Sequence, residues 1–576
     1  MGANKLFESN DRGNSWHEIS GDLTRNIDRN KFKIMGKYWP AGAVAKDVST
    51  SQWGTIVSLA ESPVKEGLVV VGIDDGVIQI TGDDGKTWNK TTQFPGVPEY
   101  TYVSDVFPSN FDENVIFASF NNTKSDDFNA YLLKTTDKGK TWTSIAGDLP
   151  KEPVHTVAQD PVNKNLLFAG TEFGFYFTLD GGHHWIKLGA GMPDIAVRDI
   201  AIQKEWKDLV IATFGRGFYI LDDYSALRQL SADKLNNTKA ILFPARDALM
   251  YIQQGDRYGT GSAWFQAPNP PFGANFTYYV KEVPQTLKQQ RLKKEKELFK
   301  KGEPIPQPTK EELDKEKNET GPYFVFVIKN DKGEVVRRLY KPAAKGIHRV
   351  NWDLRYVSPQ PVRLKNKEFN PLANGSDGML ALPGKYTVEM ELYHNGQEKP
   401  LAGPVSFTAK VLHNTTLPAN DRQALDAFFS EMSDLWRTMS GAQQYLNSLK
   451  TKTAYVQQAI QITPAATLAM KDKAQAVKEE IEKINYLFHG TPAKASFEEV
   501  PPEPMPLMKR LNEAVYASWQ STSAPTEMQK MNLKIVKDAM PDVLARIKKV
   551  DTELKTLDKE LDALKAPYTP GRIPEL

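Results

Sequence analysis

An eight-residue pattern, Ser/Thr-x-Asp-x-Gly-x-x-Trp, occurs four times in the first 185 residues of the chain. The copies begin at Ser9, Thr81, Thr135 and Thr178, so successive copies lie about 40 to 70 residues apart. At average residue usage, a chance match to this pattern is expected roughly once in 10⁵ to 10⁶ positions. Four copies therefore indicate an internal repeat, which constrains the fold more than any other feature of the sequence.

Each copy of the pattern has the composition of a tight turn that leads into a strand. The Asp and the Ser/Thr side chains accept hydrogen bonds from their own turn, and the Gly adopts a backbone conformation that a side chain would obstruct. The Trp covers the hairpin with apolar surface. One carboxylate per turn falls far short of the six to eight oxygens that Ca²⁺ needs, so we predict no metal here. The residues predicted to be structural are Ser9, Asp11, Gly13, Trp16, Thr81, Asp83, Gly85, Trp88, Thr135, Asp137, Gly139, Trp142, Thr178, Asp180, Gly182 and Trp185.

The sequence around the pattern repeats as well. Before the fourth copy come the strand-like segments 154–158 and 166–171, and after it comes 185–188. A further unit, with segments at 209–213 and 218–223, has lost the pattern. Units of four short strands, with the pattern between the third and fourth, predict the blades of a β-propeller. The sequence supplies about five such units, and the first of them is cut. We therefore expect about five blades, which form an incomplete ring.

Several segments carry a resemblance to a known group of proteins. They are 53–56, 60–63, 169–172, 212–217, 351–355 and 383–387, which read WGTI, AESP, AGTE, ATFGRG, NWDLR and PGKYT. With the repeated pattern, which we call the Asp box, they resemble bacterial sortilin-like or glycosyl-hydrolase-like Asp-box (BNR) propeller proteins, which are longer and have more blades upstream. The resemblance implies that this chain is a C-terminal portion whose missing blades belong to the same longer chain; a partner polypeptide is the alternative. It also implies a bacterial periplasmic or secreted protein.

Three regions follow from the patterning along the chain. Residues 1–225 are the predicted blades. Residues 226–412 are predicted to hold a connector and an Ig-like or fibronectin-like β-sandwich, interrupted at about 285–319 by a charged insertion read as a solvated helix and loop. Residues 413–576 switch to helical periodicity, with a heptad spacing over 543–564, and predict a helical bundle. A coiled-coil contact with a partner is the alternative for these helices.

Composition excludes several classes of function. The net charge of +2 gives no electrostatic case for nucleic acid, and no apolar run approaches the roughly 20 residues of a membrane span. The chain has no cysteine, which excludes disulfides, thiolate metal sites and cysteine nucleophiles. It also lacks GxSxG, P-loop, GxGxxG and HExxH motifs, and we predict no cofactor.

The candidate site follows from the geometry of a blade. The turn between the second and third strands lies at the opposite end of the sheet from the Asp box, and such turns surround the mouth of a propeller channel. Here these turns carry the carboxylates Asp74, Asp75, Asp126, Asp127 and Glu172, and they carry Arg216 in the last unit. Asp and Gly also favour turns for purely structural reasons, and that alternative stays open.

Three functions fit this sequence. The first is a binding or scaffold protein that engages an extended ligand, glycan or peptide, on the face opposite the Asp boxes. The second is a glycoside hydrolase, since two facing carboxylates suffice to cleave a glycosidic bond. The third is a structural or assembly subunit whose helices contact a partner. Fold alone does not choose among them.

Overall fold

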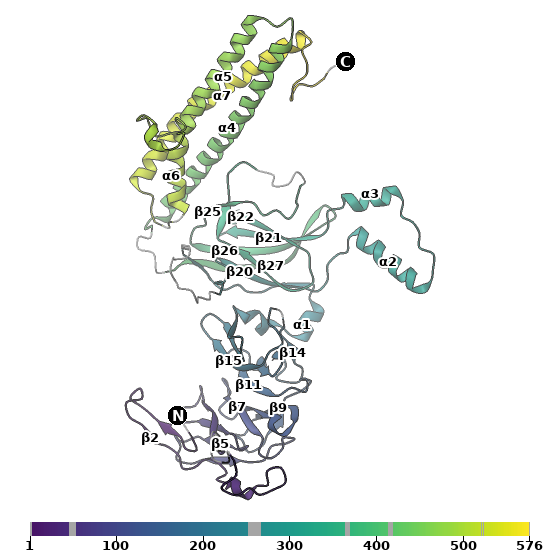
Figure 1. Ribbon diagram of the computed structural model, residues 1–576, viewed down its shortest axis with the longest axis vertical. Coiled ribbons are helices and arrows are strands. Elements are labelled where there is room, and N and C mark those ends of the chain that lie inside the picture. The colour runs from purple at the N-terminus through teal and green to yellow at the C-terminus, as the bar shows by residue number, and fades with distance from the viewer. Residues whose placement is uncertain are drawn as a thin grey trace. The chain divides into compact units, whose positions relative to one another are not determined.

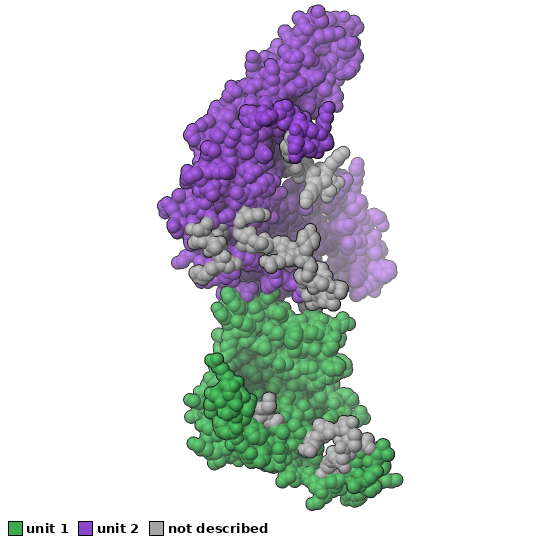
Figure 2. All heavy atoms as spheres, turned by 60° about the vertical axis from the view of Figure 1, so that its left-hand side comes forward, with its two compact units in different colours: residues 1–238 green, residues 239–576 purple. Residues whose placement is uncertain are grey.

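The computed structural model describes residues 3–574, except 45, 47–52, 190, 252–266, 363–368, 413–418, 520 and 522. The chain divides into two compact units, residues 1–238 and 239–576, coloured separately in Figure 2. Residues 252–266 of the predicted connector lie outside the described residues. The described part of the chain is mainly β, with many small sheets, and ends in a helical region. None of its helices combines the length and the apolar character required to cross a bilayer.

Unit 1 is a series of small antiparallel sheets in which each strand pairs with the next one along the chain (Figure 1). The strands are β1 (Phe7–Glu8), β2 (His17–Glu18), β3 (Ile56–Glu61), β4 (Val69–Ile73), β5 (Ile78–Thr81), β6 (Asn89–Thr91), β7 (Tyr102–Pro108), β8 (Ile116–Asn122), β9 (Asp127–Thr135), β10 (Thr143–Ser144), β11 (Val154–Gln159), β12 (Leu167–Thr171), β13 (Gly174–Thr178), β14 (Ile186–Lys187), β15 (Val197–Gln203), β16 (Asp208–Thr213) and β17 (Phe218–Leu221). Short helices η1 (Arg29–Lys31), η2 (Thr123–Ser125), η3 (Tyr224–Gln229) and α1 (Ala232–Asn237) complete the unit.

Three of these sheets have four strands, and each carries one copy of the repeated pattern. They are β3–β4–β5–β6, β7–β8–β9–β10 and β11–β12–β13–β14, and the pattern always joins the third strand to the fourth. The first copy joins β1 to β2, and β15–β16–β17 follows as a three-stranded sheet without the pattern. Because each sheet is an up-and-down meander, the turn between its second and third strands lies at the opposite end from the pattern.

The sheets of unit 1 pack against one another in chain order. Their first strands, β3, β7, β11 and β15, are neighbours, and β7, β11 and β15 follow one another in Figure 1. Ile78 of one sheet shares an apolar core with Val103 of the next. In the same way, Phe117 shares a core with Val154 of the sheet that follows it. Each sheet therefore buries one face under its successor.

The last sheet of unit 1 departs from this rule. Phe175 and Phe177 of β13 lie on the face covered by the next sheet and are 0% and 6% exposed. Their counterparts by strand register, Phe218 and Ile220 of β17, are 74% and 61% exposed. The apolar face that is buried in the preceding sheets is thus open in the last one.

Unit 2 begins with two sheets that share one core. The three-stranded sheet has the order β18–β20–β23, and the five-stranded sheet has the order β19–β27–β26–β21–β22. Two short strands in the predicted connector, β18 and β19, join these sheets. The strands are β18 (Ala240–Leu242), β19 (Ala248–Met250), β20 (Ala274–Val280), β21 (Tyr323–Asn330), β22 (Val335–Pro342), β23 (Gly346–Trp352), β24 (Arg355–Val357), β25 (Asp377–Leu380), β26 (Gly384–His394) and β27 (Gln397–Val411).

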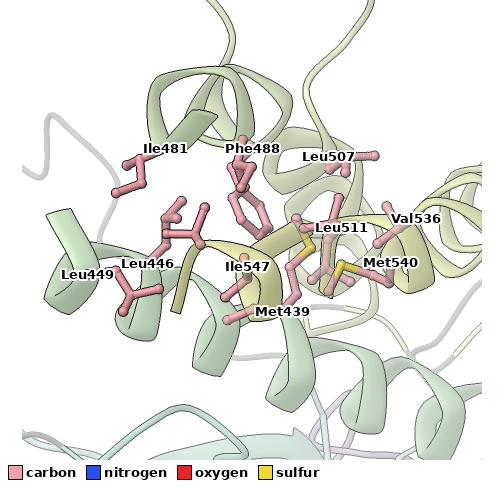
Figure 3. Close-up of a cluster of buried hydrophobic side chains, with 14 of the residues drawn as sticks. Met439, Leu446, Leu449, Ile481, Phe488, Leu507, Leu511, Val536, Met540 and Ile547 are labelled. Atoms are coloured by element: carbon pink, nitrogen blue, oxygen red, sulfur yellow. The ribbon is translucent and has the colours of Figure 1, made fainter. Parts of the chain in front are cut away.

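The charged insertion forms two helices, α2 (Leu287–Lys301) and α3 (Lys310–Asn318), neither of which has a buried residue. The C-terminal region consists of α4 (Arg422–Ile462), α5 (Leu468–His489), η4 (Phe497–Glu499), α6 (Leu507–Trp519) and α7 (Glu527–Ala563). The four α-helices pack their apolar stripes into one core, part of which Figure 3 shows around Leu446, Phe488 and Ile547. The helical region predicted from periodicity is therefore present.

Candidate functional site

The repeated pattern forms the same hydrogen-bonded turn in all four places. In the third copy, Asp137 Oδ1 accepts hydrogen bonds from the backbone N–H of Thr141 (2.8 Å) and from the Thr135 hydroxyl (2.8 Å), while Oδ2 accepts from the Thr141 hydroxyl (2.6 Å). The Thr135 hydroxyl in turn accepts from the N–H of Gly139. These bonds hold the pKa of Asp137 at about 2. Both oxygens of the Asp137 carboxylate are therefore occupied by hydrogen bonds that stabilise the turn.

The opposite end of the sheets is built differently. The first strand of each sheet pairs with the second except at one residue, which the ladder skips. The skipped residues occupy the same position in four successive sheets and are Val57, Ser104, His155 and Arg198. A β-bulge of this kind re-aims a side chain, and bulges are frequent beside functional sites.

Three of the four bulged residues line one cavity of about 360 Å³, within the usual range of small-ligand sites. We call it the mouth cavity. Its lining residues are Tyr102, Ser104, Asn121, Thr123, Lys124, His155 and Arg198. They come from the start of β7, the end of β8, η2 and the starts of β11 and β15, and so lie at the end of the sheets away from the Asp boxes.

A chain of polar contacts fixes the charged groups at the cavity. The His155 Nε2–H donates to Glu172 Oε2 (2.6 Å), which leaves Nδ1 to accept a hydrogen bond from Arg198 Nη1 (3.1 Å). Arg198 Nη2 also lies 3.5 Å from the same Glu172 oxygen. Burial lowers the pKa of His155, so the ring is neutral at neutral pH and can accept from the guanidinium. Arg198 is therefore held in place while its side chain stays 43% exposed.

The remaining lining residues add hydrogen-bonding groups and one more cation. The Lys124 ammonium lies 5.9 Å from the ring centre of Tyr102. Burial raises the pKa of Tyr102, and the negative charge of Asp74 raises it further. The Ser104 hydroxyl is buried and has no hydrogen-bond partner among the described residues. A buried hydroxyl without a partner beside a cavity is a group that a bound water or ligand would satisfy.

The carboxylates predicted for this end fall into different settings. Glu172 lies beside the mouth cavity, as described above. Asp74 Oδ1 accepts from the backbone N–H groups of Gly54 and Thr55, both at 2.8 Å. Asp75 is 2% exposed, and its Oδ2 accepts from the N–H of Arg25 at 2.7 Å. Burial raises the pKa of Asp75. Asp74 and Asp75 thus tie the β4–β5 turn to neighbouring backbone.

The other candidates lie outside the mouth cavity. Asp126 ends η2 in the left-handed conformation, with φ at 60°, and is exposed. Asp127 accepts hydrogen bonds from Asn122, Asn129 and Tyr131, and these bonds lower its pKa. Arg216 is exposed in the β16–β17 turn and does not line the cavity. The arginine that lines it is Arg198.

One further carboxylate has an unusual setting. Asp105 follows the bulged Ser104, and its Oδ2 accepts from the Thr156 hydroxyl (2.9 Å) and the Val157 N–H (3.0 Å) of the next sheet. Burial raises its pKa to about 6, and the charge of Asp199, at the equivalent position of β15, acts in the same direction. Asp105 thus joins two sheets and titrates near neutrality.

Sequence reasoning missed Ser104, His155, Arg198 and Asp105. A signal for them exists, because the first strands read Ile-Val-Ser-Leu, Val-Ser-Asp-Val, Val-His-Thr-Val and Val-Arg-Asp-Ile when aligned on the bulge. The second position of this four-residue repeat is the bulged residue. Aligning the four inner strands, as well as the turns, would have singled it out.

No protein-family model matches the chain, and no curated protein is similar to it in sequence. Among solved structures, an ancestral GH74 enzyme is 16% identical over 37% of this chain and 25% of its own, with a TM-score of 0.27. YCF48 bound to D1 peptide is 18% identical over 29% of this chain and 51% of its own, with a TM-score of 0.23. The extracellular domain of a putative hybrid two component system from B. thetaiotaomicron is 10% identical over 62% and 38%, with a TM-score of 0.24. The chain thus covers a quarter to about half of each of these proteins, and at TM-scores below 0.5 none of the likenesses carries an argument about function.

Proposed function

We propose that unit 1 is part of an Asp-box β-propeller that binds an extended ligand, glycan or peptide, across the end of its sheets opposite the boxes. The observation that carries this proposal is the convergence of Ser104, His155 and Arg198, three equivalent bulged residues, on one cavity. A bulge repeated for structural reasons alone has no need of a polar residue. At the mouth cavity, all three bulged residues are polar.

The proposal includes further blades. The open apolar face of β15–β16–β17, with Phe218 74% exposed, matches faces that the next sheet covers elsewhere in unit 1. We propose that the blades that complete the ring belong to a longer form of the same chain, with a partner polypeptide as the alternative. A bacterial periplasmic or secreted location belongs to the same proposal.

A glycoside hydrolase is the second candidate, and the raised pKa of Asp105 favours it. A carboxyl group with a pKa of about 6 has the value expected of a general acid. Against this, Asp105 points its Oδ2 at Thr156 and Val157, and Glu172 is held by His155 and Arg198. Binding without turnover is therefore the function that the contacts support best. An assembly role, with the helices of unit 2 contacting a partner, is the third candidate.

Arrays of polysaccharides and peptides, probed with the labelled chain, test the binding proposal. Thr123→Trp fills the mouth cavity and should weaken binding of any retained ligand by roughly tenfold or more. Lys140→Trp places the same side chain on an exposed residue of an Asp-box turn and should leave binding unchanged. Equal loss in both variants would contradict the location of the site. Reducing-sugar release that Asp105→Asn abolishes would establish the hydrolase instead.

A further inference from the structure

The mouth cavity presents hydrogen-bond donors and positive charge. Of its lining residues, Arg198 and Lys124 are cationic and none is acidic. Glu172 lies beside them, but both His155 and Arg198 engage its Oε2 oxygen. The lining itself thus contributes two cations and no carboxylate, while Glu172 and Asp74 lie close to it but outside it. An anionic group on the ligand would find opposite charges on Arg198 and Lys124.

Exposed phenyl rings occur at the same end of three successive sheets. Phe128 lies at the start of β9, and Phe173 and Phe214 lie in the turns that follow β12 and β16; the three are 49%, 52% and 70% exposed. The Arg198 guanidinium lies 5.4 Å from the ring centre of Phe214. Exposed aromatic faces pack against the C–H faces of sugar rings, and the Asn121, Thr123 and Tyr102 side chains suit sugar hydroxyls.

We infer that the mouth cavity binds the carboxylate of a uronic acid residue within an acidic polysaccharide. This inference rests on the proposed binding function and names its ligand class. Arg198 gives one of its five N–H groups to His155, so further donors of the planar guanidinium remain for the two oxygens of a carboxylate, and Lys124 adds a mobile point charge. An acidic peptide supplies the same carboxylate, but it lacks the hydroxyl-rich ring that the phenyl groups and the neutral polar side chains suit.

Isothermal titration calorimetry of the full chain with polygalacturonate tests the inference. Methyl esterification of the same polymer removes the charge and keeps the sugar, and it should weaken binding roughly tenfold or more. Arg198→Gln should weaken polygalacturonate binding by a similar factor and have no further effect on the esterified polymer. Arg198→Lys, which keeps the charge but loses the paired donors, should fall in between. Arg12→Gln, which changes an exposed arginine in the first Asp-box turn at the opposite end of the sheets, is the matched control and should bind as the parent does.

The possible results distinguish a failure of this inference from a failure of the proposed binding function. If the esterified polymer binds as tightly as polygalacturonate and Thr123→Trp abolishes both, the site binds glycans and the carboxylate inference is overturned. If poly-glutamate binds at least as tightly as polygalacturonate, the ligand is a peptide and the glycan class is overturned. Dextran sulfate binding at least as tightly would overturn the choice of carboxylate. If no polysaccharide and no peptide binds, the proposed function itself fails.

Discussion

The two ends of each sheet in unit 1 are built on different principles. At the Asp-box end, the hydrogen bonds of the aspartate join residues two to four positions apart, as from Thr135 to Asp137 and from Thr141 to Asp137. At the mouth end, they join different sheets, as from Thr156 to Asp105 and from Arg198 to His155, 51 and 43 residues apart. A turn that satisfies itself locally can recur almost unchanged in every sheet. The residues that contribute to a site between sheets differ from one sheet to the next, and these differences can give the site its ligand specificity.

The largest effect expected at the Asp-box end comes from the tryptophan that covers the turn. Trp142 is 5% exposed and lies in the core between two sheets, whereas Trp16, at the same position of the first copy, is 50% exposed. Trp142→Ala should lower the free energy of unfolding by about 3 to 5 kcal/mol because it leaves a large cavity. Differential scanning calorimetry of the full chain measures the shift in the melting transition of unit 1.

Trp16→Ala is the matched control for this prediction and should shift the transition far less. Equal destabilisation by the two substitutions would mean that the pattern stabilises through its own turn rather than through the sheet that it covers. In that case, the two ends of the sheets would not differ in whether their stability comes from contacts within a turn or from contacts between sheets. Ligand binding should survive in folded Trp142→Ala, since the tryptophan lies at the end away from the mouth cavity.

The same distinction explains what the sequence did and did not predict. The Ser/Thr-x-Asp-x-Gly-x-x-Trp pattern located the third and fourth strands, because the hydrogen bonds of its Ser/Thr and Asp side chains lie within eight residues. The alternation of buried and partly buried residues along β20 is likewise a local signal. The candidate site was only partly predicted. Glu172 was predicted because it lies in the turn between the second and third strands of its sheet. Arg198 was missed because its role depends on His155, which a different sheet supplies.

The second prediction concerns the close approach of sheets at the mouth end. A Cβ added to Gly170 would lie 2.6 Å from Val197 Cγ1 and 2.7 Å from Thr156 Cγ2, so Ala has no room there. Gly170→Ala should therefore lower the free energy of unfolding by about 1 to 3 kcal/mol, because the sheets that carry His155 and Arg198 must separate. Gly189→Ala, which meets nothing within 4 Å, should be nearly neutral. Chemical denaturation curves compare the two, and an undisturbed Gly170→Ala would show that the sheets are not in tight contact.

The third and smallest effect is a difference in how the two ends respond to pH. Asp105 at the mouth end has a pKa of about 6 when folded, raised from a value of 3.8, so the folded state favours its protonated form. Its contribution to stability is present below pH 4 and is lost as pH rises through 6, which makes the ionised carboxylate a cost at pH 8. Asp105→Asn should therefore gain stability over the parent as pH rises from 4 to 8, by on the order of 1 kcal/mol.

An aspartate at the Asp-box end provides the control for this pH dependence. The folded pKa of Asp137 is about 2, lowered from 3.8, so its stabilising contribution is complete above pH 4 and is lost only as pH falls toward 2. The difference in the free energy of unfolding between Asp137→Asn and the parent should accordingly stay constant from pH 8 to pH 5, whatever its size. Unfolding free energies measured at several pH values in that window decide the matter. If the Asp105→Asn difference is flat as well, the Asp105 carboxyl is exposed to water rather than buried between sheets, and the mouth end is looser than its contacts with Thr156 and Val157 indicate.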